Sequence, residues 1–191
     1  MARTKYGNVI SDKMLSTTWG EHIFSCIDDA KDIENGWVGF LGELAVGKEI
    51  YELLEPTTAT IDTEELILVD QPAEVYQGFS KADFRDEYFI NEAGISFRCR
   101  KPRVGDVFSI TDYTIDPLSP TDGVQAGNFV VAQDGSHRLK EVAAPTGTEV
   151  FVGKIIDFKS TGVQFASIGL NFGGGSTLRY ASIQTIKNTK V

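Results

Sequence analysis

Beyond His22 the sequence alternates short apolar segments with turn-forming residues, and this pattern most constrains the fold. No stretch keeps apolar residues at positions i, i+3, i+4 and i+7 for three helical turns, so long amphipathic helices are not expected. Residues 48–54 instead alternate charged with apolar side chains, as in a strand with one buried face. The strands expected on this basis are residues 22–27, 37–41, 48–54, 66–69, 105–111, 128–132, 150–158, 163–170 and 178–186.

About nine short strands at close spacing predict an all-β fold, either a β-barrel or a β-sandwich of short antiparallel strands. Asn35 and Gly36 precede one strand and favour a hairpin or a corner there. The glycines of residues 173–176 are expected to join the last two strands as a flexible hairpin loop. One or two short helices at most are expected, within residues 79–97.

The chain of 191 residues is long enough for one domain with its own core. Residues 1–20 lack both helical and strand periodicity and predict an extended N-terminal arm, followed by a β-rich domain over residues 21–191. The prolines and glycine of residues 117–123 mark the only place where that domain could divide into two lobes.

The predicted arm is positively charged, whereas the rest of the chain is acidic. Arg3, Lys5 and Lys13 against Asp12 give the arm a net charge of +2, which leaves −11 for the remainder of a chain with net charge −9. Opposite charges favour contact between the arm and an acidic surface of a second copy or of another protein. A solubilising terminus without a partner is the alternative. The candidate partner-binding residues are Arg3, Lys5, Tyr6, Lys13 and Trp19.

Composition argues against two classes of partner. A net charge of −9 repels phosphate backbones and anionic lipids, so neither nucleic acid nor membrane is expected as a partner. The sequence contains neither a signal-peptide pattern nor a run of about 18 apolar residues, which predicts a cytosol-like environment. Cys26 and Cys99 are either two buried thiols or one long-range disulfide.

The sequence predicts a protein without an enzyme active site, a cofactor site or a metal site. The only histidines, His22 and His137, have no metal-ligand spacing, and neither a serine elbow nor a Cys–His signature occurs. The acidic residues around Asp28 do not follow the order of a calcium loop. A glycosidase would need two convergent carboxylates in a cleft, and a carbohydrate-binding module would need exposed aromatic platforms such as Trp19 or Trp37.

Several segments, taken in order, resemble a family of tailed-bacteriophage proteins. The first are residues 89–94, Asn91 among them, and the run 105–111 after the arginines at positions 98 and 100. The others are residues 32–36, 49–56, 127–130 and 152–156. Together they resemble the head-decoration, or cement, proteins of these phages.

This resemblance implies a non-enzymatic virion protein with a β domain and an N-terminal arm. Such a protein binds the outer surface of the capsid and fastens neighbouring subunits of the major capsid protein. Its expected partners are the major capsid protein and other copies of itself, a trimer being one arrangement, and its expected location is the capsid surface after synthesis in the host cytoplasm. The alternatives are another virion component, such as a tail or head-fibre base protein, or a β-sandwich carbohydrate-binding module.

Overall fold

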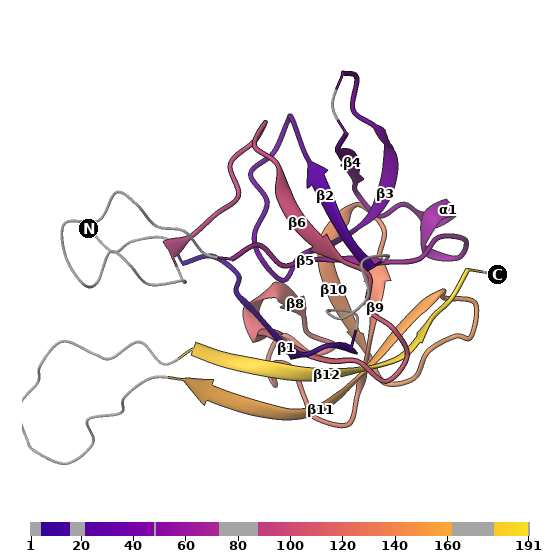
Figure 1. Ribbon diagram of the computed structural model, residues 1–191. Coiled ribbons are helices and arrows are strands. Elements are labelled where there is room, and N and C mark those ends of the chain that lie inside the picture. The colour runs from indigo at the N-terminus through magenta and orange to yellow at the C-terminus, as the bar shows by residue number, and fades with distance from the viewer. Residues whose placement is uncertain (1–4, 16–21, 48, 73–87, 162–177, 191) are drawn as a thin grey trace, which may run out of the picture.

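The computed structural model describes residues 5–15, 22–47, 49–72, 88–161 and 178–190 and confirms a mainly β fold (Figure 1). Strands make up 48% of the described residues and helical turns only 7%, so the core must be built between sheets. One short α-helix, α1 (Thr58–Ile61), and one 3-10 turn, η4 (Asp112–Thr114), accompany the strands in this part of the chain.

The middle of the sequence forms a closed five-stranded barrel. Its strands follow one another around the barrel in the order β2 (Ile23–Ile27), β4 (Tyr51–Leu54), β3 (Val38–Leu44), β5 (Ile67–Val69) and β6 (Phe97–Arg100). All neighbours are antiparallel except β2 and β4, which run parallel. Closure removes the free sheet edges that would otherwise need protection.

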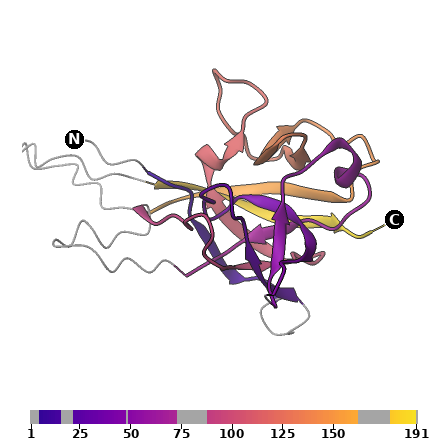
Figure 2. The ribbon, with the colours of Figure 1, turned by 90° about the horizontal axis from the view of Figure 1, so that it is seen from above.

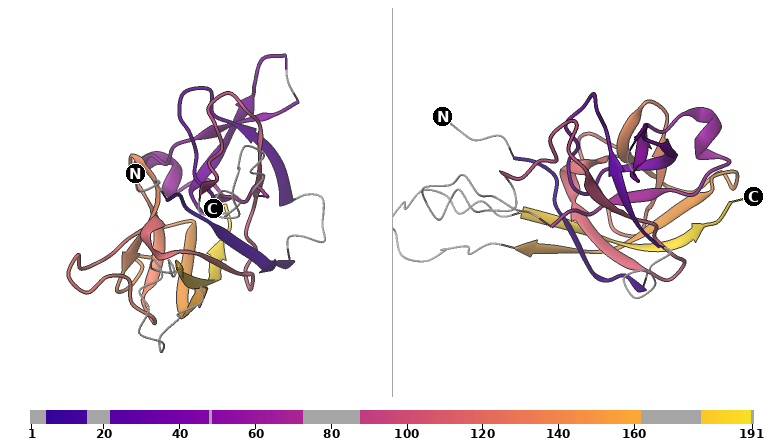
Figure 3. Two further views of the ribbon diagram at one scale, coloured as in Figure 1. Left: turned by 90° about the vertical axis from the view of Figure 1, so that its left-hand side faces the viewer. Right: turned by 45° about the horizontal axis from the view of Figure 1, so that its top comes forward.

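The N-terminal and C-terminal parts of the chain together form a seven-stranded sheet. The order across the sheet is β1 (Val9–Lys13), β7 (Val107–Thr111), β12 (Leu178–Asn188), β11 (Phe151–Thr161), β9 (Phe129–Gln133), β10 (Ser136–Val142) and β8 (Ile115–Asp116). Only β8 and β10 pair in parallel. The barrel lies on one side of this sheet, as the views from the side and from above show (Figures 2 and 3).

Alternation along the barrel strands separates two hydrophobic cores. On β5, Ile67 points into the barrel interior with Cys26 and Phe97, whereas Leu68 belongs to the larger core between the barrel and the sheet. That larger core joins Leu68 to Phe108 on β7 and to other fully buried residues of the sheet. Successive residues of a strand face opposite sides, so one barrel wall fills both cores and fixes the barrel on the sheet.

Trp37 and His137 add a second connection between the barrel and the sheet. Their rings stack with centroids 5.7 Å apart and planes inclined by 5°. Nδ1 of His137, on β10, lies 2.8 Å from the carbonyl oxygen of Val38 and donates a hydrogen bond to it. The histidine is 4% exposed, and it therefore serves the packing of the two sheets.

The N-terminal segment differs from the expected arm, because residues 9–13 form the edge strand β1. Its pairing with β7 includes Val9 opposite Ile110. Gly7 crosses the barrel so closely that an added Cβ would lie 2.3 Å from the carbonyl oxygen of Asn35. Met14 is 2% exposed. Residues 5–15 are thus part of the packed fold; residues 1–4 and 16–20 of the predicted arm lie outside the described residues.

The predicted boundary at residues 117–123 falls within the seven-stranded sheet, between β8 and β9. The chain passes from barrel to sheet earlier, between β6 and β7. The loop that contains the predicted boundary is held to the sheet by Glu141 of β10, whose buried carboxylate accepts hydrogen bonds from the N–H groups of Leu118 at 2.9 Å and Gln125 at 2.8 Å. That loop therefore does not separate two lobes.

Several expected elements have a different partner or extent. The turn at Gly36, with φ of 85°, is a corner and not a hairpin, because β2 pairs with β4 and β6. Strands β1, β6, β8 and β10 were not expected from the sequence. The expected strand at 163–170, the hairpin loop at 173–176 and residues 79–87 of the segment where a helix was expected lie outside the described residues. Residues 88–97 of that segment contain no α-helix.

Candidate interaction surfaces

Side chains that could have carried catalysis or metal binding instead hold the fold together. His22 is buried and contacts the guanidinium of Arg103. Oδ1 of Asp28 accepts hydrogen bonds from two N–H groups of its own loop, and Oδ1 of Asp32 accepts one from Ala93 at 2.9 Å. Within the described residues, no three His, Cys, Asp or Glu side chains are grouped to hold a metal ion.

Cys26 and Cys99 are free thiols on neighbouring barrel strands. Both are 0% exposed and lie inside the barrel core. Burial raises the pKa of the Cys99 thiol, and its interaction with the Cys26 thiol raises that pKa further. Of the two alternatives that the sequence left open, the structure therefore contains the pair of buried thiols.

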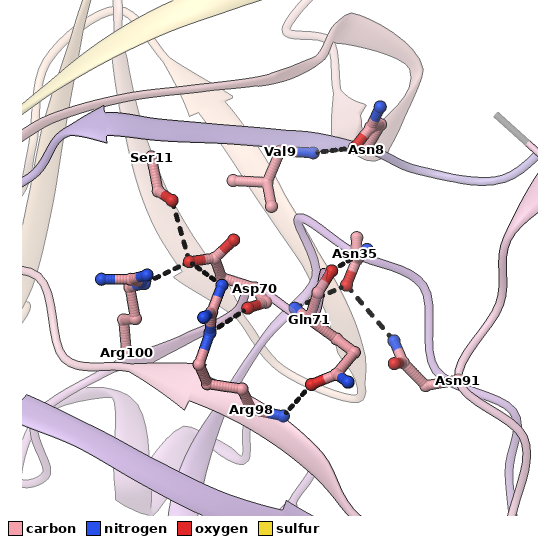
Figure 4. Close-up of polar contacts among 9 residues, drawn as sticks. All are labelled: Asn8, Val9, Ser11, Asn35, Asp70, Gln71, Asn91, Arg98 and Arg100. Atoms are coloured by element: carbon pink, nitrogen blue, oxygen red, sulfur yellow. Dashed lines mark hydrogen bonds and ion pairs between the residues drawn. The ribbon is translucent and has the colours of Figure 1, made fainter. Parts of the chain in front are cut away.

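A polar cluster surrounds Asp70, where β1 crosses the outer wall of the barrel (Figure 4). The Asp70 carboxylate accepts a hydrogen bond from Ser11 Oγ of β1 at 2.9 Å. It also forms ion pairs with Nη2 of Arg98 at 3.3 Å and with Nε of Arg100. Asp70 is 4% and Arg100 7% exposed. Two guanidinium groups of β6 thus share one carboxylate, and the same carboxylate binds Ser11 of β1 and so holds β1 against β6.

The cluster continues into an amide network that connects three loops. The side-chain amide of Asn35 makes two hydrogen bonds to the backbone of Gln71. Its Nδ2 donates to the carbonyl oxygen at 2.9 Å, and its Oδ1 accepts from the N–H at 3.1 Å. Asn91 Nδ2 donates to the carbonyl oxygen of Ile33 at 2.8 Å and to Oδ1 of Asn35 at 3.3 Å. Because Asn35 and Asn91 are buried, this network stabilises the fold and offers no open site to a substrate.

The predicted partner-binding residues are only partly described. Lys5 is exposed ahead of β1, and Lys13 is exposed at its far end. Tyr6 is half-buried, and its carbonyl oxygen accepts a hydrogen bond from the Tyr113 hydroxyl. The structure therefore places the two lysines at opposite ends of a docked strand. Arg3 and Trp19 lie outside the described residues.

A second exposed surface, absent from the expectations, is the β3–β4 hairpin of the barrel. Leu44 and Val46 are 54% and 99% exposed, and Leu54 on β4 is 40% exposed. Three carboxylates on the same hairpin, those of Glu43, Glu49 and Glu52, are also exposed. The sequence pattern alone did not distinguish Leu44 from the buried residues of the same strand. We call residues 43–54 the barrel hairpin.

The barrel hairpin has the composition of a contact surface. Exposed aliphatic side chains on one element favour association, and neighbouring acids select a partner with basic groups. The hairpin projects from the top of the barrel in Figure 1.

Comparisons with family models, curated proteins and solved structures find no match to this chain. Among the described residues, the helices are too short to cross a membrane.

Proposed function

We propose that this chain is a virion structural protein that decorates the outer surface of a phage capsid and fastens neighbouring major capsid subunits. Its partners would be the major capsid protein and other copies of itself, without nucleic acid or membrane. It would be made in the host cytoplasm and reside on the capsid surface. The proposal assigns the protein no enzymatic activity.

The observation that supports this proposal most is where the resembling segments lie. Residues 32–36 and 89–94 meet at the isolated bridge between Ile33 and Asn91. Residues 127–130 and 152–156 pair with each other, and the N–H of Gly127 donates to the carbonyl oxygen of Ile155 at 2.8 Å. Segments far apart in sequence thus contact one another in the fold, which supports considering the resembling segments together.

The exposed surfaces suit a protein that is fixed to a lattice. The barrel hairpin offers aliphatic contacts at a projecting end, and Lys5 and Lys13 offer positive charge along β1. Many copies on one particle need only moderate affinity each, because contacts within a shell act at high effective concentration. A carbohydrate-binding role has less support, since Trp37 stacks on His137 and does not form an open platform.

The test is binding of the purified chain to capsids from the phage that encodes it, prepared without this protein. We expect the chain to co-sediment with these capsids, to saturate at a fixed copy number and to appear as extra density on the outer surface. Absence of binding to intact capsids at saturating concentration would refute the proposal.

The barrel hairpin can be tested in the same assay. Replacing Leu44 and Val46 by glutamate should weaken capsid binding at least about tenfold, since truncated hot-spot residues cost this much or more. Leu118→Glu, at an equally exposed leucine of the β8–β9 loop (53% exposed), serves as the matched control. Equal binding by all three proteins would exclude the hairpin as the contact.

Deletion of residues 2–18, the direct test of an arm, is unsuitable because it removes β1. Charge reversal at Lys5 and Lys13 tests the same idea without removing buried residues, because both side chains are exposed. We expect the paired reversal to weaken capsid binding, and a thermal melt establishes that the variant is folded. Unaltered binding would exclude these two lysines as capsid contacts.

A further inference from the structure

The distal half of β11 has a strand edge without a partner in the described structure. On one side β11 pairs with β12 along its whole length, up to Thr161 opposite Leu178. On the other side it pairs with β9 only at Gly153 and Lys154, and Ile155 makes two more backbone hydrogen bonds, with Asn128 and Gly127. Residues 156–161 therefore present an open edge. The β11–β12 ribbon extends past β9 in Figure 1.

The local geometry shows which groups this edge presents. The Phe158 N–H donates to the carboxylate of Asp157 at 2.7 Å, a side chain of its own strand. The phenyl ring of Phe158 lies under the guanidinium of Arg179, 3.6 Å from ring centroid to Cζ. A backbone donor at an open edge is a site to which a second strand can add.

The charges along the edge are complementary to themselves. Asp157 and Lys159 flank Phe158, and neither forms an ion pair with another described residue. Two antiparallel copies with Phe158 opposite Phe158 place Asp157 of each copy against Lys159 of the other. Registers centred on Asp157 or on Lys159 instead place like charges opposite each other, which is unfavourable.

We propose that this edge is a self-association site, at which β11 of one chain pairs antiparallel with β11 of a second copy about a two-fold axis. The outward N–H and C=O of Phe158 would bond to those of its mate, and the Asp157 carboxylate would move from the Phe158 N–H to the partner's Lys159. The arrangement is isologous, so it closes as a dimer and does not propagate. The inference concerns the free chain and does not depend on capsid binding.

The size of the edge sets the expected strength. A few paired residues give less contact than a standard stable interface, and two acidic chains repel each other at long range. The dimer should therefore be weak, with a dissociation constant on the order of 100 µM at physiological salt. Crowding on a surface would raise its occupancy by effective concentration.

The experiment is sedimentation equilibrium of the full chain over a concentration series. The average mass of the wild type should rise from the 20.9 kDa of the monomer toward that of a dimer. Asp157→Lys alone and Lys159→Asp alone should each weaken self-association at least about tenfold, because each homodimer then contains two like-charge pairs.

An equimolar mixture of the two variants should associate at least as well as the wild type, because their heterodimer contains two opposite-charge pairs. The double variant Asp157→Lys/Lys159→Asp should also recover. Asp122→Lys and Lys140→Asp, at exposed positions away from the edge, serve as matched controls and should behave like the wild type, alone and mixed. Thermal melts establish that all variants are folded.

Two results would overturn the proposal. The first is a wild type that stays monomeric throughout the series. The second is a pair of weakened single variants that do not recover when mixed, because the charge effect would then not arise from Asp157 facing Lys159. Since no capsid is present, neither result bears on the proposed capsid binding.

Discussion

Replacing Asp70 by asparagine should destabilise the protein by several kcal/mol, on the order of the cost of breaking a buried ion pair. The substitution keeps the shape of the side chain but leaves two guanidinium groups without their shared counter-charge. Arg100 is 7% exposed, so water cannot replace the lost carboxylate. The Arg98 side chain is 31% exposed and can regain hydration in part.

These burials set the expected magnitude. Breaking a buried ion pair by removing one partner costs about 3–5 kcal/mol. The expected loss lies near the lower limit, because water can hydrate Arg98 and the asparagine oxygen can still accept a hydrogen bond. For a chain of this length, about 3 kcal/mol corresponds to a fall in melting temperature of roughly 6–12 °C. The free energy of unfolding is measured by urea titration, followed by the fluorescence of the two tryptophans.

Asp116→Asn is the matched control, because Asp116 also pairs with an arginine. Its contact with Arg138 is 3.4 Å long, and the two side chains are 43% and 42% exposed, so its loss should cost less than about 1 kcal/mol. Removing both charges with Asp70→Leu/Arg100→Met should recover part of the stability lost in Asp70→Asn. A loss below about 1 kcal/mol for Asp70→Asn would refute the assignment of a buried, shared carboxylate.

Three further predictions concern single sites. Gly153→Val should lower the free energy of unfolding by at least about 1–3 kcal/mol, because an added Cβ would lie 2.6 Å from Cγ2 of Ile183; an unchanged thermal melt would contradict this close approach. Burial opposes ionisation of Glu149, but the hydrogen bonds that its carboxylate accepts outweigh burial and lower its pKa below the ordinary 4.5. The stability from Glu149 is therefore present above that value and lost as the pH falls through the lowered pKa, and Glu149→Gln should reduce this acid-side slope in urea titrations; an unchanged slope would argue against those hydrogen bonds. Cys26 and Cys99 should resist a thiol reagent in the folded protein and react on unfolding, and because the Cys99 pKa is raised, its contribution to stability should decline as the pH rises above 9.0; rapid labelling of the native protein would contradict their burial.

The sequence predicts the strands whose apolar side chains alternate or run together. Leu66 to Val69 was expected as a central strand, and the structure places β5 there with both faces buried. Strand β10 was missed because two of its inward positions carry His137 and Glu141 instead of aliphatic side chains. Glu141 is 0% exposed, and it is stabilised by N–H groups of a loop that only the fold brings close. Hydropathy cannot identify such a strand.

Strand β6 shows the same limit in a different way. Phe97 and Cys99 point into the barrel. Arg98 and Arg100 alternate with them, and both contact Asp70 beneath β1. The burial of an arginine depends on a counter-charge 28 or 30 residues away, so spacing along the chain does not reveal it.

The docking of β1 changes how the proposed capsid contact would operate. The Thr111 N–H donates to the carbonyl oxygen of Asn8 at 3.1 Å, and the Asn8 N–H donates to the Thr111 hydroxyl at 3.2 Å. The Nδ2 of Asn8 donates to the Tyr180 hydroxyl at 3.1 Å. Lys5 and Lys13 are therefore presented at fixed positions before any partner arrives. A free arm would lose conformational entropy on binding, whereas a docked strand has already lost it during folding. Each lysine contact can then contribute to affinity without that backbone cost. The fixed spacing of the two lysines would also select a capsid surface whose acidic groups have the same spacing.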